Sequence, residues 1–113
     1  MAAYVRKKRV GDHEYYQLVQ SRRVRGQPRQ KVLLHLGRHG SVEEALSGWP
    51  REIRRLRAVA RKDRERLESL PEPEKSAGWA KEIARRAHTA ERRADALEGH
   101  LKELRDLKKE GSV

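Results

Sequence analysis

Basic side chains alternate with tyrosines through the first third of the chain, in a pattern that suits contact with a nucleic acid. Lysine and arginine neutralise phosphates, while tyrosine and glutamine side chains contact bases. The same pattern also fits a solvated sheet face on which lysine and arginine protect strand edges from aggregation. The residues that we predict to contact nucleic acid are Arg6, Lys8, Tyr15, Arg22, Arg23, Arg25, Arg29 and Lys31.

The uneven distribution of charge favours the nucleic-acid interpretation. The chain of 113 residues has 28 Lys and Arg against 17 Asp and Glu, a formal net charge of +11. Residues 1–40 hold ten basic and two acidic residues, or +8, whereas residues 41–113 hold eighteen and fifteen, or +3. Edge protection does not require +8 over forty residues, so we expect a polyanionic partner for this segment.

The elements that position these residues are expected to be three antiparallel strands. Runs of β-branched and aromatic residues between turn signals predict strands over residues 4–10, 13–22 and 29–36. Gly11-Asp12 supplies the first turn, and Gly26 with Pro28 the second. Strand periodicity would place Gln30, Val32, Leu34 and Leu36 on one face of the third strand.

The second turn places a run of arginines at the tip of a hairpin, from Arg22 to Gln27. Arginine is the side chain that most often reads guanine by paired hydrogen bonds, so this tip is expected to enter a groove of duplex DNA. Three strands need a further element packed on one face to be stable. We expect that element to be helical.

The helical part should begin at Ser41, because Ser41-Val42-Glu43-Glu44 has the pattern of a capping box. A short helix is predicted from there to about Ser47, with Gly48-Trp49-Pro50 as a break. Pro50 suits the first turn of a second helix, where its missing N–H is tolerated. Trp49 is expected to be a buried anchor of the core.

Two heptad patterns follow and predict a long antiparallel coiled-coil hairpin. The Pro-rich loop 71–76 separates them, and Ser76 is the expected cap of the second helix. The seam can close within one chain or between two copies, so a homodimer through the helical arms stays open. The predicted seam residues are Ile53, Leu56, Ala60, Asp63, Leu67 and Leu70, then Ile83, Ala87, Ala90, Ala94, Leu97, Leu101 and Leu104.

Asp63 is the polar member of this seam, and we expect it to pair with an arginine or histidine across the hairpin. Arg54, Arg57, Arg61 and Arg64 form a stripe on one face of the first arm, which could follow a phosphate backbone. Glu65 and Glu68 follow Arg61 and Arg64 by four residues. Ordinary surface pairing is therefore the favoured explanation of the stripe.

Composition argues against several other functions. Only 35% of the residues are hydrophobic while 40% are charged, so the chain can bury a small core but no large catalytic pocket. There is no cysteine, and the five histidines lack ligand spacing, so we expect no metal or other cofactor and no enzyme activity. No apolar run approaches the roughly 20 residues that span a bilayer, so we expect a cytoplasmic protein without a membrane partner.

One stretch carries a family resemblance, from Tyr15-Tyr16-Gln17-Leu18-Val19 through Ser21-Arg22-Arg23 and Arg29-Gln30-Lys31-Val32 to Leu36-Gly37-Arg38. Over about residues 4–46 it resembles the extreme N-terminal segment of bacterial insertion-sequence transposases of the DDE class. Small standalone bacterial proteins carry a similar segment. The chemistry of those transposases depends on three carboxylates in a ribonuclease-H-like core, for which this chain is too short. The resemblance therefore implies a DNA-recognition module and transfers no catalytic residue.

We thus predict an α+β protein, with a basic three-stranded meander and short helix over residues 1–48 and a helical hairpin over residues 49–113. The favoured function is non-catalytic binding of double-stranded DNA by the basic strands. Two alternatives remain open from the sequence. The same surface could bind RNA or the ribosome, or the helical arms could serve protein interaction or dimerisation with no nucleic-acid role.

Overall fold

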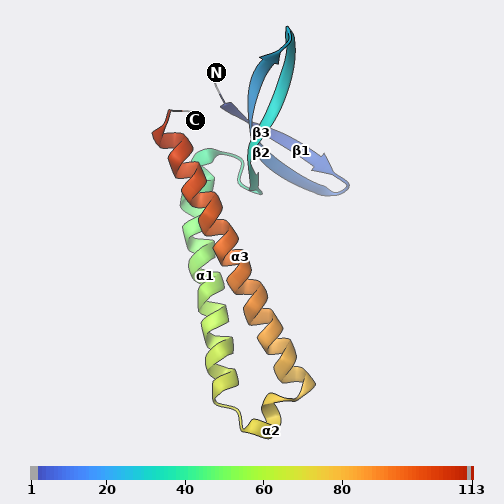
Figure 1. Ribbon diagram of the computed structural model, residues 1–113, viewed down its shortest axis with the longest axis vertical. Helices are drawn as coiled ribbons and strands as arrows, with labels where there is room; N and C mark the ends of the chain where they lie inside the picture. The colour runs from blue at the N-terminus through green and yellow to red at the C-terminus, as the bar shows by residue number, and fades with distance from the viewer. Residues whose placement is uncertain (1–2, 112) are drawn as a thin grey trace. The chain divides into compact units, whose positions relative to one another are not determined.

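The computed structural model of the chain describes residues 3–111 and 113, and it has an α+β fold (Figure 1). One antiparallel sheet in the order β1-β2-β3 comes first, and helices follow it. The elements are β1 Ala3–Val10, β2 His13–Val24, β3 Gln27–Gly37, α1 Val42–Glu68, α2 Glu72–Lys75 and α3 Gly78–Lys109. The predicted fold class is confirmed.

The chain divides into two compact units. The first comprises residues 1–49 together with 100–113, and the second comprises residues 50–99. The predicted division of the chain at residue 49 stays a prediction. The end of α3 falls within the first compact unit. Leu101 and Leu104 explain this, because both are buried and so contribute apolar surface to the first unit.

The sheet of the first unit is bent along its central strand. Figure 1 shows the β1–β2 turn and the β2–β3 turn pointing in different directions. The register of β2 against β3 shifts twice, between Tyr16 and Gln17 and between Leu18 and Val19. Such irregularities bend a strand and increase its twist.

These shifts correct the predicted face pattern of β3. Leu18 pairs with Leu34 and the adjacent Val19 pairs with Val32, so Leu34 and Val32 lie on opposite faces of the sheet. Leu34 is 5% exposed and Val32 is 38% exposed, although Val19, the partner of Val32, is buried. The prediction assumed strict alternation of faces along β3. It failed because an extra residue in one strand reverses the face of every residue beyond it.

Helix α1 begins with the predicted cap. The Ser41 hydroxyl accepts a hydrogen bond from the Glu44 N–H at 3.1 Å, and the Glu44 carboxylate accepts one from the Gly40 N–H at 2.8 Å. The first bond satisfies a free amide of the first helical turn, and the second bond holds the residue that precedes the cap.

The predicted break at Gly48-Trp49-Pro50 is wrong, because α1 runs without interruption through Pro50. An internal proline removes one hydrogen bond and costs about 3 kcal/mol. Here Ala45, Trp49 and Ile53 are all buried, and their four-residue spacing lies on one line only if the helix is continuous. Burial of these three side chains offsets the proline.

The second unit is a helical hairpin. Ion pairs join α1 to α3, and Figure 1 shows the two helices side by side with α2 between their ends. The Pro-rich loop is shorter than expected, since residues 72–75 form α2, Ser76 ends it, and α3 begins at Gly78.

The predicted seam positions of this hairpin are buried or half-buried, and Ala80, which was not among them, is buried as well. Ile53, Ala60 and Asp63 of α1 and Ala87, Ala90 and Ala94 of α3 are buried, and the remaining seam residues of the second unit are half-buried. Ala60, Ala87 and Ala90 form a small apolar cluster with Leu56 against it. Knobs-into-holes packing along the seam stays a prediction. None of the described helices combines the length and apolar composition needed to cross a membrane.

Candidate nucleic-acid interface

The outer part of the β2–β3 hairpin carries most of the predicted binding residues. Val24 pairs with Gln27, which leaves Arg25 and Gly26 as a two-residue turn. Their φ angles are 55° and 77°, and positive values at both central positions are the pattern of a type I′ turn. This turn matches the strand twist, so the ribbon continues straight to its tip and presents Arg25 there.

Every residue of this ribbon from Ser21 to Val32 is exposed. We call this segment the basic hairpin. The sequence has no acidic residue between Glu14 and Glu43, and none of the hairpin cations forms an ion pair with any residue that the structure describes. The hairpin therefore presents five uncompensated positive charges, on Arg22, Arg23, Arg25, Arg29 and Lys31.

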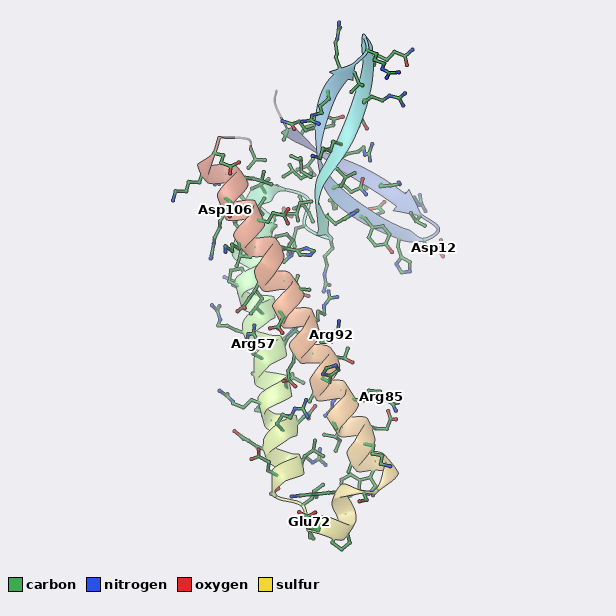
Figure 2. All side chains as sticks on the ribbon, viewed as in Figure 1. Asp12, Arg57, Glu72, Arg85, Arg92 and Asp106 are labelled. Carbon is green, nitrogen blue, oxygen red and sulfur yellow. The ribbon has the colours of Figure 1, made fainter. Side chains whose placement is uncertain are left out.

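The strand register brings two of these charges together. Arg22 pairs directly with Arg29 across the ribbon, and Lys31 pairs with Gln20 two residues away on the same face. Like charges opposite each other destabilise a strand pair. Arg23 pairs with Pro28 and lies on the other face, so cations project from both sides and from the tip. Figure 2 shows nitrogen-tipped side chains gathered around this end of the sheet.

Lys8 and Tyr15 lie elsewhere in the sheet, on the β1–β2 pair. They are directly opposite each other, and both are exposed. Their neighbour Lys7 forms an ion pair with Glu14 at 3.1 Å, and this hydrogen bond raises the pKa of Lys7. Charge is thus partly compensated on this pair of strands. Lys8 on β1 and Tyr15 near the start of β2 are therefore separate from the five cations of the basic hairpin, which lie at the far end of β2 and on β3.

Arg6 belongs to a polar network that sequence reasoning missed. Its guanidinium donates a hydrogen bond to the Gln17 side-chain oxygen at 2.7 Å and another to the Gln30 side-chain oxygen. Gln30 in turn donates to the Tyr4 hydroxyl at 2.6 Å, and the Gln17 amide nitrogen lies 3.3 Å from His35 Nδ1. Gln17 is only 7% exposed. The Arg6 side chain therefore links all three strands, and two of its donors are used inside the protein.

The pairing of residues between neighbouring strands could have revealed this network. Gln17 lies opposite Arg6 on one side and opposite His35 on the other. Residues that pair across neighbouring strands share a face of the sheet. The register shifts between β2 and β3 mean that His35 could not be identified as the partner of Gln17 from sequence spacing alone. Arg6 thus combines a predicted binding position with an internal structural role.

The arginine stripe of the first helical arm is divided by the structure. Arg57 contacts Asp95 at 3.0 Å and Glu98 at 2.8 Å, and Arg64 contacts Glu91 at 2.8 Å. The hydrogen bonds to Asp95 and Glu98 raise the pKa of Arg57. The expected pairing within α1 is replaced by pairing across to α3. Arg54 and Arg61 are exposed and form no ion pair with the described residues.

Asp63 is paired across the hairpin, as the sequence predicts. Two nitrogens of Arg86 donate to its two carboxylate oxygens at 2.8 and 2.7 Å. These hydrogen bonds hold the pKa of Asp63 below its ordinary value, against the opposing effect of burial. Two parallel bonds define both distance and orientation, so this pair sets the register of α1 against α3.

Two of the histidines pack against an aromatic side chain. His39 and His100 approach Trp49 edge-on, each with ring centroids 6.1 Å from it. A Cβ at Gly48 would overlap the His39 ring, so a larger residue there would displace the histidine. Among the residues that the structure describes, no group of three His, Cys, Asp or Glu side chains is placed to hold a metal ion.

The fold and this surface define a small basic α+β module with an uncompensated β-ribbon. The chain belongs to the family described as IS1634 family transposase, N-terminal domain, which it matches over residues 4–110. This confirms the resemblance seen in residues 4–46 and extends it over both long helices, on which the resemblance was silent. The matched domain does not include the catalytic core of a transposase. No curated protein and no solved structure matches the chain significantly.

Proposed function

We propose that the chain binds double-stranded DNA through the basic hairpin and does so without catalysing a reaction itself. The observation that carries this proposal is the set of five exposed, uncompensated cations, two of them directly opposed at Arg22 and Arg29. Such an arrangement costs stability in the free protein and is relieved by an anionic partner. Membership of a transposase N-terminal domain family is consistent with a DNA-binding role.

The shape of the hairpin supports duplex DNA as that partner. The major groove of B-DNA admits a two-stranded β-ribbon, and arginine forms paired hydrogen bonds with guanine there. With cations on both faces of the ribbon, the side chains on each face reach the phosphates of one strand while Arg25 reaches the groove floor. Phosphate neutralisation would supply most of the affinity, so we expect modest sequence specificity.

The proposal predicts a strong dependence of binding on salt. Four to six phosphate contacts by the basic hairpin contribute roughly −4 to −5 to the slope of log affinity against log salt on duplex DNA, and contacts elsewhere in the chain would steepen it further. Fluorescence anisotropy with labelled duplex, single-stranded DNA and RNA across a salt series measures it. Replacing Arg22, Arg23, Arg25 and Arg29 with alanine should make the slope shallower by about 3 to 4 and leave the helical circular dichroism unchanged.

A matched control separates a local site from net charge. Replacing Lys81, Arg92, Lys102 and Arg105 of α3 with glutamine removes the same four charges, and all four are exposed without an ion pair to described residues. The control should keep a slope close to that of the wild type. Equal effects of the two variants would place the site outside the basic hairpin. Preference for RNA over duplex in competition would assign RNA binding, and no affinity for any nucleic acid at low salt would favour a protein partner.

A further inference from the structure

A second group of uncompensated cations lies on α1, within the second unit. Its members are exposed, and none forms an ion pair with a residue that the structure describes. They fall within twelve successive positions, so they extend over about 17 Å at the usual helical rise. We call this group the outer basic face of α1, and it consists of Arg51, Arg54, Arg55, Arg61 and Lys62.

Helical geometry places these residues on one side of α1. At about 3.6 residues per turn, positions 51, 55 and 62 lie nearly in line, with 54 and 61 beside them. The opposite side carries the buried Ile53, Ala60 and Asp63 that face α3. Figure 2 shows nitrogen-tipped side chains on the side of α1 that points away from α3.

The pairing across the hairpin explains why this face is uncompensated. The acidic residues of α1 from 51 to 63 are Glu52 and Asp63. Glu52 forms an ion pair with Arg93 at 3.2 Å, and Asp63 forms one with Arg86 at 2.7 Å. Both carboxylates are therefore neutralised by residues of α3. The acidic groups of α3 nearest to them are used by Arg57 and Arg64. The carboxylates of α1 between residues 51 and 63 are therefore used by α3, and Glu65, four residues after Arg61, is exposed and forms no ion pair with a described residue.

The composition of the face indicates which polyanion it would bind. A helix that lies in a membrane interface needs a broad apolar face beside its basic one. Here the apolar residues between the outer cations are Ala58 and the exposed Val59, and these two do not make a broad apolar face. A duplex carries about ten phosphates over the same 17 Å, so five cations along this length of helix can neutralise part of its backbone.

We propose that the outer basic face of α1 is a second phosphate-binding surface for duplex DNA, separate from the basic hairpin. The proposal rests on the proposed function for its choice of partner, and it adds a contact that the strands do not make. This surface has no groove-reading element, so it contributes affinity that is independent of DNA sequence.

The test compares three full-length variants that each lose four positive charges. The arm variant replaces Arg54, Arg55, Arg61 and Lys62 with glutamine, which has a similar helix propensity. The other two are the hairpin variant and the α3 control described above. Anisotropy with a labelled duplex is measured from about 50 to 200 mM salt, and thermal melts verify that each variant is folded. We expect the arm variant to lose at least tenfold in affinity near 100 mM salt and to have a slope shallower by about 2 to 3.

The outcomes distinguish the two proposals. An arm variant that behaves like the α3 control, with a hairpin variant that binds weakly, overturns the second surface and leaves the proposed function standing. A weak arm variant with an unaffected hairpin variant supports the second surface and moves the proposed site from the strands. Retention of the wild type but not the arm variant on phosphatidylserine vesicles, with unchanged duplex affinity, would overturn the proposal and assign the face to a membrane surface.

Discussion

The basic hairpin and the helical hairpin are both rich in arginine, but the two regions use it differently. In the helical hairpin, Arg57, Arg64, Arg86 and Arg93 each reach a carboxylate on the facing helix. In the basic hairpin, Arg22 faces Arg29 and no described residue compensates either charge. Arginine therefore contributes to stability in one region and opposes it in the other. An arginine is therefore assigned to a structural or a binding role by whether a carboxylate lies beside it. The number of arginines in a region does not distinguish the two roles.

The largest effect expected from this comparison comes from reversing one charge in each region. Arg86→Glu would place two carboxylates together at the buried Asp63, so the melting temperature should fall by about 10 °C or more. Arg29→Glu would place opposite charges together at Arg22, so the melting temperature should stay the same or rise slightly. Thermal denaturation followed by circular dichroism measures both.

The same two variants should rank oppositely in DNA binding. Arg29→Glu should weaken duplex affinity more than Arg86→Glu, provided that binding is measured below the melting temperature of each. If Arg29→Glu lowers stability as much as Arg86→Glu does, the assignment of the hairpin arginines to binding would be contradicted.

A smaller effect is expected at Arg6, which lies in the basic sheet but is internally bonded. Arg6→Ala would leave the buried Gln17 without one partner and should reduce the free energy of unfolding by about 1 kcal/mol. The reduction is limited because Arg6 Nε is already buried without a partner among the described residues. Urea denaturation measures this change. If Arg6→Ala left stability unchanged but made the salt slope of duplex binding shallower by about 0.9, the value for one phosphate contact, Arg6 would instead belong to the phosphate-binding residues.

The smallest effect concerns pH. The pKa of Asp63 is lower in the folded protein than its ordinary value of 3.8, so the Arg86 pair stabilises the fold above that pH. This contribution is lost as the pH falls from about 4 through the folded-state pKa. The melting temperature of the wild type should therefore exceed that of Asp63→Asn at pH 6, and the gap should narrow by pH 2.5. A gap that does not change with pH would contradict this linkage.

Much of the local structure could be predicted from residue types. The Ser41 cap, the turn at Gly26 and the buried seam positions all follow from local propensity and periodicity, which depend on a few neighbouring residues. The predicted helix break at Pro50 failed because burial of Trp49 and Ile53, a tertiary effect, outweighs the local preference of proline.

The candidate site could be predicted only in part. The five hairpin cations were identified from charge density, since a run without acidic residues has no local partner. The internal role of Arg6 was not identified. Of the outer basic face of α1, only Arg54 and Arg61 were named, in a stripe whose favoured explanation was surface pairing. Both depend on which side chains come into contact across strands or helices. Shifts in strand register and the reach of arginine side chains determine these contacts.

By itself the sequence determined an α+β chain with basic antiparallel strands, a capped helix and an apolar seam containing one aspartate. Only the tertiary structure decided which charges are neutralised, because a carboxylate compensates an arginine only within a few ångströms. That distance is set by strand register and by the approach of α1 to α3, which bring together residues as far apart in sequence as Glu52 and Arg93.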